Sequence, residues 1–240
     1  MLVEVVAFNL HSALVAATAG ADRIEICDNI HEGGTTPSYG CVRVLKQKLS
    51  IPVFPMIRPR GGDFLYTNEE TDAMLADIEL FKNIGCEGIV VGCLLQNGTV
   101  DKEKLTSFVK AAHPMSVTFH RAFDRCENAF KALEDIIECG CSRILTSGQM
   151  PFAHEGIPLI RELILKAANR ILIIPGGGIT SDIIMDLVEE TKATEYHTPV
   201  KAVVSSRMNY CQEKMQETLE TISVNVNELH LIKQLIQRKA

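Results

Sequence analysis

The chain has 240 residues, of which 46% are hydrophobic and 22% are charged, and its formal net charge is −6. This composition supports one or more packed cores and excludes a chain that is disordered throughout. A negative net charge argues against a nucleic-acid-binding protein, which carries a basic face, so any anionic ligand must be bound locally.

The N-terminus and the cysteines indicate the cellular setting. The first ten residues, MLVEVVAFNL, contain no basic segment and place Glu4 inside their apolar run, which is not the pattern of a secretory signal. No stretch of the sequence reaches transmembrane length. Eight cysteines without a signal favour reduced thiols over a disulfide framework. We therefore expect a cytoplasmic protein that binds neither membrane nor nucleic acid.

Short β-rich runs alternate with amphipathic helical patterns along the whole chain. Between the runs, apolar residues recur with helical period, as at Leu105, Phe108 and Ala112, and Thr67 with Glu70 forms a capping box. The predicted strands cover residues 3–7, 23–27, 52–57, 88–92, 115–120, 143–146, 171–175 and 194–197.

Strands that alternate with helices pair in parallel, and eight such units close naturally into a barrel. The sequence therefore predicts an α/β fold, a TIM-like (βα)8 barrel, as a single domain over residues 1–240, because no linker composition interrupts it. A doubly wound open sheet is the alternative. Residues 198–227 lack strong periodicity and are predicted to form a long loop, followed by a closing helix.

In a barrel of this kind the site lies at the C-terminal ends of the strands, and strand alternation decides which side chains point inward. Glu25 and Cys27 are expected to face the interior, as are Glu4 on the first strand and His197 on the last. Buried charges are costly unless they pair or hold a ligand. For Glu4, Glu195 and His197 a purely structural ionic core explains the pattern equally well.

The segment Arg58-Pro59-Arg60-Gly61-Gly62 follows the third strand. The proline fixes the backbone between two arginines, and the glycines allow close approach to a ligand. We expect Arg58 and Arg60 to clamp an anion, although a surface loop paired with nearby acids is the alternative.

The segment His120-Arg121-Ala122-Phe123-Asp124 places an imidazole, a guanidinium and a carboxylate within one turn of a strand end. His120 would act as general acid or base if Asp124 or Glu25 oriented it, and Arg121 would stabilise developing charge. A hydrogen-bonded core histidine is the alternative.

Two further segments suit anion binding. Gly176-Gly177-Gly178 follows the seventh strand and precedes a helix expected to begin near Thr180, a position where barrels bind phosphate on backbone N–H groups. Thr146 and Ser147 after the sixth strand would add hydroxyl donors. Tight turns explain both segments equally well.

The thiols suggest a different chemistry. Thiolate and thioether ligands select Cu(I) or Zn, so Cys27 together with Cys93, Met56 or a histidine would form a soft metal site. No CxxC or HxxxH motif accompanies them, and buried reduced cysteines are the alternative.

Taken together, several segments resemble the CutC family of copper homeostasis proteins. They are Ile24 to Cys27, EGGTTPS at 32–38, MIRPRGGDF at 56–64, VDKEKL at 100–105, VTFHRAFD at 117–124, RILTSGQ at 143–149 and GGGI at 176–179. The family's usual Gly-Leu-Thr-Pro-Ser is Gly-Thr-Thr-Pro-Ser at 34–38 here. The resemblance implies a TIM-like barrel, a cytoplasmic location, a homodimer and a role in copper handling, with Cys27 as a Cu(I) ligand.

Two functional hypotheses follow, and a third is weaker. The first is a copper homeostasis protein that binds copper ion, Cu(I), through Cys27. The second is a TIM-barrel enzyme acting on a small phosphorylated or carboxylated metabolite with Arg58, Arg60 and His120, because guanidinium and imidazole groups suit an anionic substrate better than a soft metal. The third is a non-catalytic sensor that binds such a metabolite in the same pocket.

Overall fold

The computed structural model describes residues 1–238 and contains the eight parallel strands that the sequence predicts. The strands are β1 (Leu2–Ala7), β2 (Arg23–Ile26), β3 (Val53–Pro55), β4 (Gly88–Val91), β5 (Ser116–Phe119), β6 (Arg143–Thr146), β7 (Leu172–Pro175) and β8 (Glu195–Thr198). The helices are α1 (Leu10–Thr18), α2 (Tyr39–Lys48), α3 (Asn68–Asn83), α4 (Lys102–Ala112), α5 (Ala129–Cys139), α6 (Ile157–Ala167), α7 (Ile184–Thr191) and α8 (Val226–Gln237).

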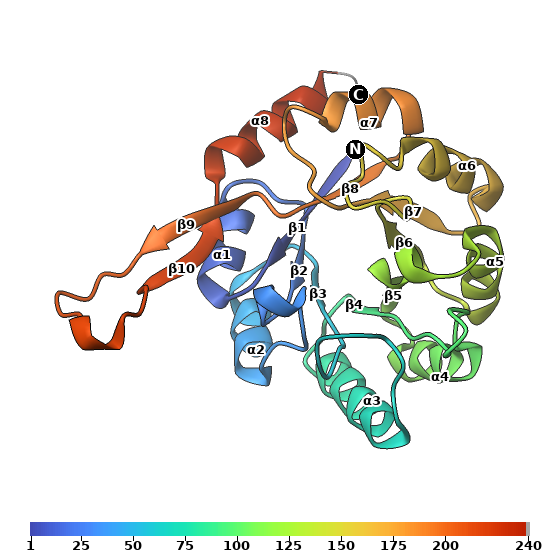
Figure 1. Ribbon diagram of the computed structural model, residues 1–240, viewed down its shortest axis with the longest axis horizontal. Helices are drawn as coiled ribbons and strands as arrows, with labels where there is room; N and C mark the ends of the chain where they lie inside the picture. The colour runs from blue at the N-terminus through green and yellow to red at the C-terminus, as the bar shows by residue number, and fades with distance from the viewer. Residues whose placement is uncertain (239–240) are drawn as a thin grey trace.

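The strands form a closed barrel rather than an open sheet. Their order is β3-β2-β1-β8 in one half and β4-β5-β6-β7 in the other. Parallel bridges join the halves on both sides, from Met56 to Val90 and from Gly176 to His197. The helices surround the strands as an outer ring (Figure 1). The prediction of a TIM-like barrel is therefore confirmed, and the doubly wound alternative is excluded.

The helices pack on the strands through the apolar faces that their period predicts. In α4, Leu105, Phe108 and Ala112 are all buried. Burying a leucine or phenylalanine side chain contributes about 2 kcal/mol, so the ring of helices supplies much of the driving force for folding. The capping box at the start of α3 is also present, with the side chain of Thr67 accepting from the Glu70 amide. No helix within residues 1–238 has the length and apolar character to cross a membrane.

The segment after β8 differs from the prediction of a loop. It forms an antiparallel hairpin of β9 (Lys201–Ser205) and β10 (Glu220–Val224), which extends away from the barrel beside α1 (Figure 1). Asn9 Nδ2 donates to the Ile222 carbonyl at 2.7 Å and ties the hairpin to the start of α1. No Asn-Gly or Asp-Gly turn marks this hairpin in the sequence, which is why the pattern does not reveal it. The closing helix is confirmed as α8.

The lower barrel interior is filled by charged and aromatic side chains. Gly88 makes room for the ring of Phe54, since a Cβ atom there would lie 2.3 Å from Phe54 Cε2. The guanidinium groups of Arg23 and Arg143 lie over that ring, at 5.0 and 4.9 Å from its centroid. This layer lies below the polar side chains at the C-terminal ends of the strands.

Candidate functional site

A cavity of about 130 Å³ opens at the C-terminal ends of the strands, where the sequence places the site. It is lined by Val6, Phe8, Glu25, Cys27, Gly33, Met56, Arg58, Phe64, His120, Arg121, Leu145 and His197. A neighbouring cavity of about 370 Å³ shares Gly33, Arg58, Phe64 and Arg121 with it and adds Glu32, Asp124, Arg125, Gln149 and Met150. The two together form an inner chamber and a more polar outer one.

A pair of sulfur atoms lies in the wall of the inner cavity. Cys27 Sγ is 4.0 Å from Met56 Sδ, and both residues are buried. Gly34 covers the pair, because a Cβ atom there would lie 2.9 Å from Met56 Sδ and 3.2 Å from Cys27 Sγ. Cys93, which the sequence also offers as a partner for Cys27, donates to the Asp101 carbonyl at 3.5 Å and does not line the cavity. Within residues 1–238, Cys27 and Met56 are the sulfur residues that line this cavity.

Glu25 is the proton acceptor nearest to the Cys27 thiol. Cys27 Sγ donates to Glu25 Oε1 at 3.4 Å. Burial raises the pKa of Cys27 well above its ordinary value, and the negative charge of Glu25 raises it further. Burial also raises the pKa of Glu25 to about 7, although the charge of His197 opposes this. The thiol is therefore protonated near neutral pH, and ligation by Cys27 requires the loss of that proton.

His197 is held by a buried carboxylate. Its Nδ1 lies 2.7 Å from Glu4 Oε1 and 3.3 Å from Glu25 Oε2. Burial alone would lower the pKa of His197, but the charges of Glu25 and Glu4 raise it above its ordinary value. Burial alone would raise the pKa of Glu4, but His197 and Arg23 lower it to about 2. Glu4 is therefore ionised and fixes the imidazole ring.

Arginines complete the buried ionic layer. Arg23 bridges two carboxylates, with Nε 2.5 Å from Glu4 Oε2 and Nη2 2.5 Å from Glu195 Oε2. Arg143 Nε lies 3.4 Å from the same oxygen of Glu195. An ionic network therefore joins Glu4, Glu195 and His197, as a structural ionic core would require. Within this layer, Glu25 and His197 also line the cavity.

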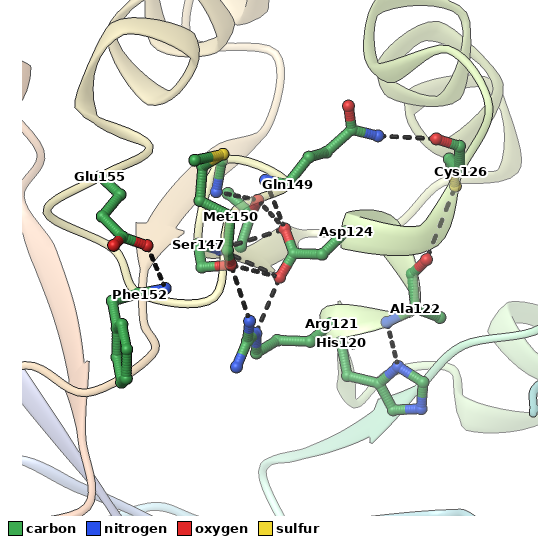
Figure 2. A network of polar contacts seen from close by, with 12 residues as sticks. His120, Arg121, Ala122, Asp124, Cys126, Ser147, Gln149, Met150, Phe152 and Glu155 are labelled. Carbon is green, nitrogen blue, oxygen red and sulfur yellow. Dashed lines mark hydrogen bonds and ion pairs between the residues drawn. The ribbon is translucent and has the colours of Figure 1, made fainter. Parts of the chain in front are cut away.

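His120 lies in the cavity wall, but not as a carboxylate-oriented acid or base. Its Nδ1 accepts from the Ala122 amide at 3.1 Å (Figure 2), and its Nε2 is buried without a hydrogen bond among the described residues. Burial and the charge of Arg58 lower its pKa to about 3, so the ring is neutral. Its expected partners, Asp124 and Glu25, both bond other groups, because the strand ends point these carboxylates in different directions.

Arg58 lies in the cavity as predicted, but backbone groups hold it. Its Nη1 donates to the carbonyls of Glu32 at 2.6 Å and Gly34 at 2.8 Å, and its Nη2 donates to Gly62 at 3.0 Å. The guanidinium also lies over the Phe64 ring, 5.0 Å from the centroid. Arg58 therefore anchors the loop that carries Gly34 and contributes positive charge to the site.

Arg60 is held by carboxylates outside both cavities, and the Arg58/Arg60 clamp stays a prediction. Arg60 Nε donates to Glu70 Oε1 at 2.6 Å, and its Nη1 lies 3.0 Å from Asp63 Oδ1. It lines neither cavity of the site. Strand alternation does not extend to this residue because β3 ends at Pro55, and the capping carboxylate of α3 draws the guanidinium outward.

Asp124 is the centre of a network that ties β5 to β6. It accepts from Arg121 Nε at 2.7 Å and from the Ser147 hydroxyl at 2.9 Å (Figure 2). It also accepts from the Thr146 hydroxyl at 2.5 Å. The hydroxyls of Thr146 and Ser147, expected to face a ligand, are therefore engaged by this carboxylate. Arg121 remains in the wall of both cavities.

The glycine run after β7 adopts the open backbone conformations that the sequence suggests. Gly177 and Gly178 have φ of +119° and +72°. The following helix starts at Ile184 rather than near Thr180, and Phe152 covers Gly178, since a Cβ atom there would lie 2.8 Å from the Phe152 ring. Gly176 packs against Leu145 and His197. A phosphate site on Gly176, Gly177 and Gly178 stays a prediction.

Phe64 and Arg125 are among the residues of the site that sequence reasoning missed. The Phe64 ring lies beside His120, with the two ring centroids 4.8 Å apart. The Arg125 guanidinium lies 5.1 Å from the same Phe64 ring, in the outer cavity. Both residues lie in or next to segments singled out above, MIRPRGGDF and VTFHRAFD, but only the folded chain brings the two segments together.

Comparisons with known proteins agree with these segments. The sequence model of the CutC family matches residues 1–202. The chain is 47% identical over 215 residues to a family protein CutC of Parabacteroides distasonis, covering 89% of this chain and 88% of that protein. It is also 47% identical over 209 residues to the human copper homeostasis protein cutC homolog, covering 87% of this chain and 77% of the human one.

A solved structure is similar as well. The putative copper homeostasis protein CutC from Streptococcus agalactiae superposes with a TM-score of 0.78 at 34% identity. The match covers 82% of this chain and 98% of the streptococcal one.

Proposed function

Because the chain belongs to the CutC family, we propose that it acts in copper homeostasis and binds Cu(I) through Cys27 and Met56. The observation that carries this proposal is the sulfur pair beneath Gly34. Thiolate and thioether sulfur are the ligands that select Cu(I) in proteins, and both occur here in the wall of one cavity.

The spacing of the pair suits a shared ion. With metal–sulfur bonds of roughly 2.3 Å, two sulfur ligands of one ion can be up to about 4.6 Å apart. The 4.0 Å between Cys27 Sγ and Met56 Sδ is within this limit. An ion would reach the pair from the cavity, because both residues line it.

The proton of Cys27 has a nearby acceptor. Ligation requires the thiolate, and the thiol already donates to Glu25 Oε1. The positive charge of Arg58 also favours the thiolate. We therefore assign Glu25 the role of accepting the Cys27 proton when Cu(I) binds.

The test is the Cu(I) affinity of the reduced protein, measured anaerobically by competition with a chromophoric chelator. A Cys211→Ala background removes the exposed thiol. We expect one ion per chain, bound more tightly than about 1 nM, and loss of this binding in Cys27→Ala. Cys86→Ala, at a buried cysteine that does not line the cavity, is the control. Weak binding that is equal in all three proteins would contradict the proposal.

The same proposal includes a cytoplasmic location and a homodimer, as the family resemblance implies. All eight cysteines are free thiols, which suits a reducing compartment. Light scattering of the purified protein tests the dimer, and fractionation of cells tests the location.

A second candidate function is an enzyme acting on a small anionic metabolite, and the outer cavity favours it. Arg58, Arg121 and Arg125 all line that cavity. The structure shows Arg125 stacked on Phe64 and gives it no carboxylate partner within residues 1–238. An anion between Arg121 and Arg125 would lie beside the inner cavity, where His197, oriented by Glu4, is better suited to acid–base work than His120.

Thermal stability in the presence of inorganic phosphate and of small phosphorylated and carboxylated metabolites tests the second candidate. We expect stabilisation that is lost in Arg125→Gln and kept in Arg43→Gln, a surface control. A ligand that stabilises the protein but is never converted would favour the sensor hypothesis. No stabilisation by any anion would exclude both.

A further inference from the structure

Three ligand-type side chains meet on the inner side of the barrel, below the sulfur pair. Glu4, Glu25 and His197 come from the adjacent strands β1, β2 and β8, where Glu4 is paired in register with His197. One carboxylate oxygen of each acid and one ring nitrogen all lie within 4.8 Å of one another, and all three residues are buried. The neighbouring parallel strands thus bring three donor atoms close together.

The charges around this point are not balanced by fixed groups. The Oε2 atom of Glu4 and the carboxylate of Glu195 are paired with Arg23, and Arg143 also faces Glu195. These arginines offset two carboxylates. The charge of Glu25 is left to be offset by a proton on the cluster or by a cation.

Glu25 itself points a free acceptor at the cluster. It is 2% exposed, and its Oε2 makes no hydrogen bond among the described residues. That oxygen lies 3.3 Å from His197 Nδ1, but the Nδ1 hydrogen is directed to Glu4 Oε1 at 2.7 Å. A buried carboxylate oxygen without a donor is costly, so a positive ligand at this point would be stabilising.

We propose that Glu4, Glu25 and His197 bind a divalent cation of the kind that prefers carboxylate oxygen with one imidazole, for which Mn²⁺ is the probe. Two carboxylates and an imidazole suit such an ion, whereas Cu(I) prefers sulfur. With bonds of about 2.1 Å, two ligands of one ion lie up to roughly 4.2 Å apart. The separations of His197 Nδ1 from Glu4 Oε1 and Glu25 Oε2, 2.7 and 3.3 Å, are below that limit.

The ion would have an open coordination position. Glu25 and His197 line the inner cavity, whereas Glu4 lies beneath it, so the ligands approach the ion from one side. Binding through Nδ1 requires the ring proton to move from Nδ1 to Nε2. The bound ion would therefore face the cavity and any ligand in it.

The experiment uses the full chain and follows Mn²⁺ binding by the loss of the free-ion electron paramagnetic resonance signal. We expect one Mn²⁺ per chain, and affinity at least about tenfold weaker in Glu25→Gln and in His197→Gln. The Glu25→Gln substitution keeps the side-chain shape and an acceptor for the Cys27 thiol, so this variant is expected to fold. Cys27→Ala is the matched control and should retain Mn²⁺ binding, since it removes the neighbouring soft ligand alone.

The wild-type protein gives a second readout that needs no variant. Mn²⁺ should broaden the imidazole NMR signals of His197 much more strongly than those of the exposed His113, which precedes β5 at the opposite end of the barrel. Wild-type binding no tighter than about 1 mM, or binding unchanged in both variants, would overturn the proposal. The Cu(I) proposal stands or fails separately, because Cu(I) affinity depends on Cys27 and should persist in His197→Gln.

Discussion

Cys27 Sγ lies 4.0 Å from Met56 Sδ, although the two residues follow different strands and are separated along the chain by helix α2. Adjacent parallel strands end at the same edge of the barrel, which brings the two sulfurs together.

Met56→Leu should reduce Cu(I) affinity by about tenfold or more while keeping the fold, because leucine replaces the thioether at similar volume. The measurement is chelator competition with the reduced protein. Met74→Leu is the control, since Met74 is a fully buried methionine of α3 that lines no part of the site. Equal losses in the two variants would show that the effect comes from packing and not from ligation.

Gly34→Ala should both destabilise the protein and disturb the sulfur pair. Gly34 has φ of +102°, and the new Cβ would lie 2.9 Å from Met56 Sδ. Backbone strain alone costs about 1–3 kcal/mol. Urea unfolding measures the loss, and Gly40→Ala is the control, because a Cβ at Gly40 of α2 meets nothing within 4 Å and should stabilise slightly. If Gly34→Ala were as stable as the wild-type protein, the loop would not be in tight contact with the sulfur pair.

His120 should make the folded state less stable in acid. Burial and the charge of Arg58 lower its pKa from 6.5 to about 3, so between these values the unfolded chain binds a proton that the folded chain does not. The neutral ring makes its full contribution to the free energy of unfolding above pH 6.5. This contribution decreases as the pH falls, by about 1.4 kcal/mol per pH unit. His120→Gln should remove up to one proton from the slope of unfolding free energy between the two pKa values, about 3 and 6.5. A wild-type slope in His120→Gln would contradict this assignment.

Asp124→Asn should destabilise the protein by about 2 kcal/mol, because the amide nitrogen cannot accept from the buried hydroxyls of Thr146 and Ser147. Thermal unfolding measures the change. Asp182→Asn is the control, since Asp182 is exposed on the surface. If the Asp124 variant kept full stability but lost ligand binding, Asp124 would act on the ligand and not on the loop.

Much of the site was predictable because strand alternation is a local property. The inward positions of Glu25 on β2 and His197 on β8 follow from the alternation of side chains along short strands, and Cys27, one residue beyond β2, keeps the same parity. Several residues beyond the end of a strand, parity no longer applies. Arg60 lies beyond the end of β3 at Pro55, and its direction is set by Glu70, which belongs to the next helix.

The pairing of side chains was not predictable. The sequence offered Asp124 and Glu25 as partners for His120, but Asp124 bonds the loop after β6 and Glu25 faces His197. These contacts join strands that are far apart in the sequence, so no spacing along the chain encodes them. The hairpin of β9 and β10 was missed for a related reason, since its strands pair across a long connection without a turn signature.

The sequence by itself determined the barrel, its eight strands and the edge at which the polar residues gather, because hydrophobic period and alternation act over a few residues at a time. Its motifs also determined the family. Only the tertiary structure decided which charges neutralise one another, which histidine a carboxylate orients and which two sulfurs meet. Those outcomes depend on distances between different strands, and closure of the barrel sets these distances.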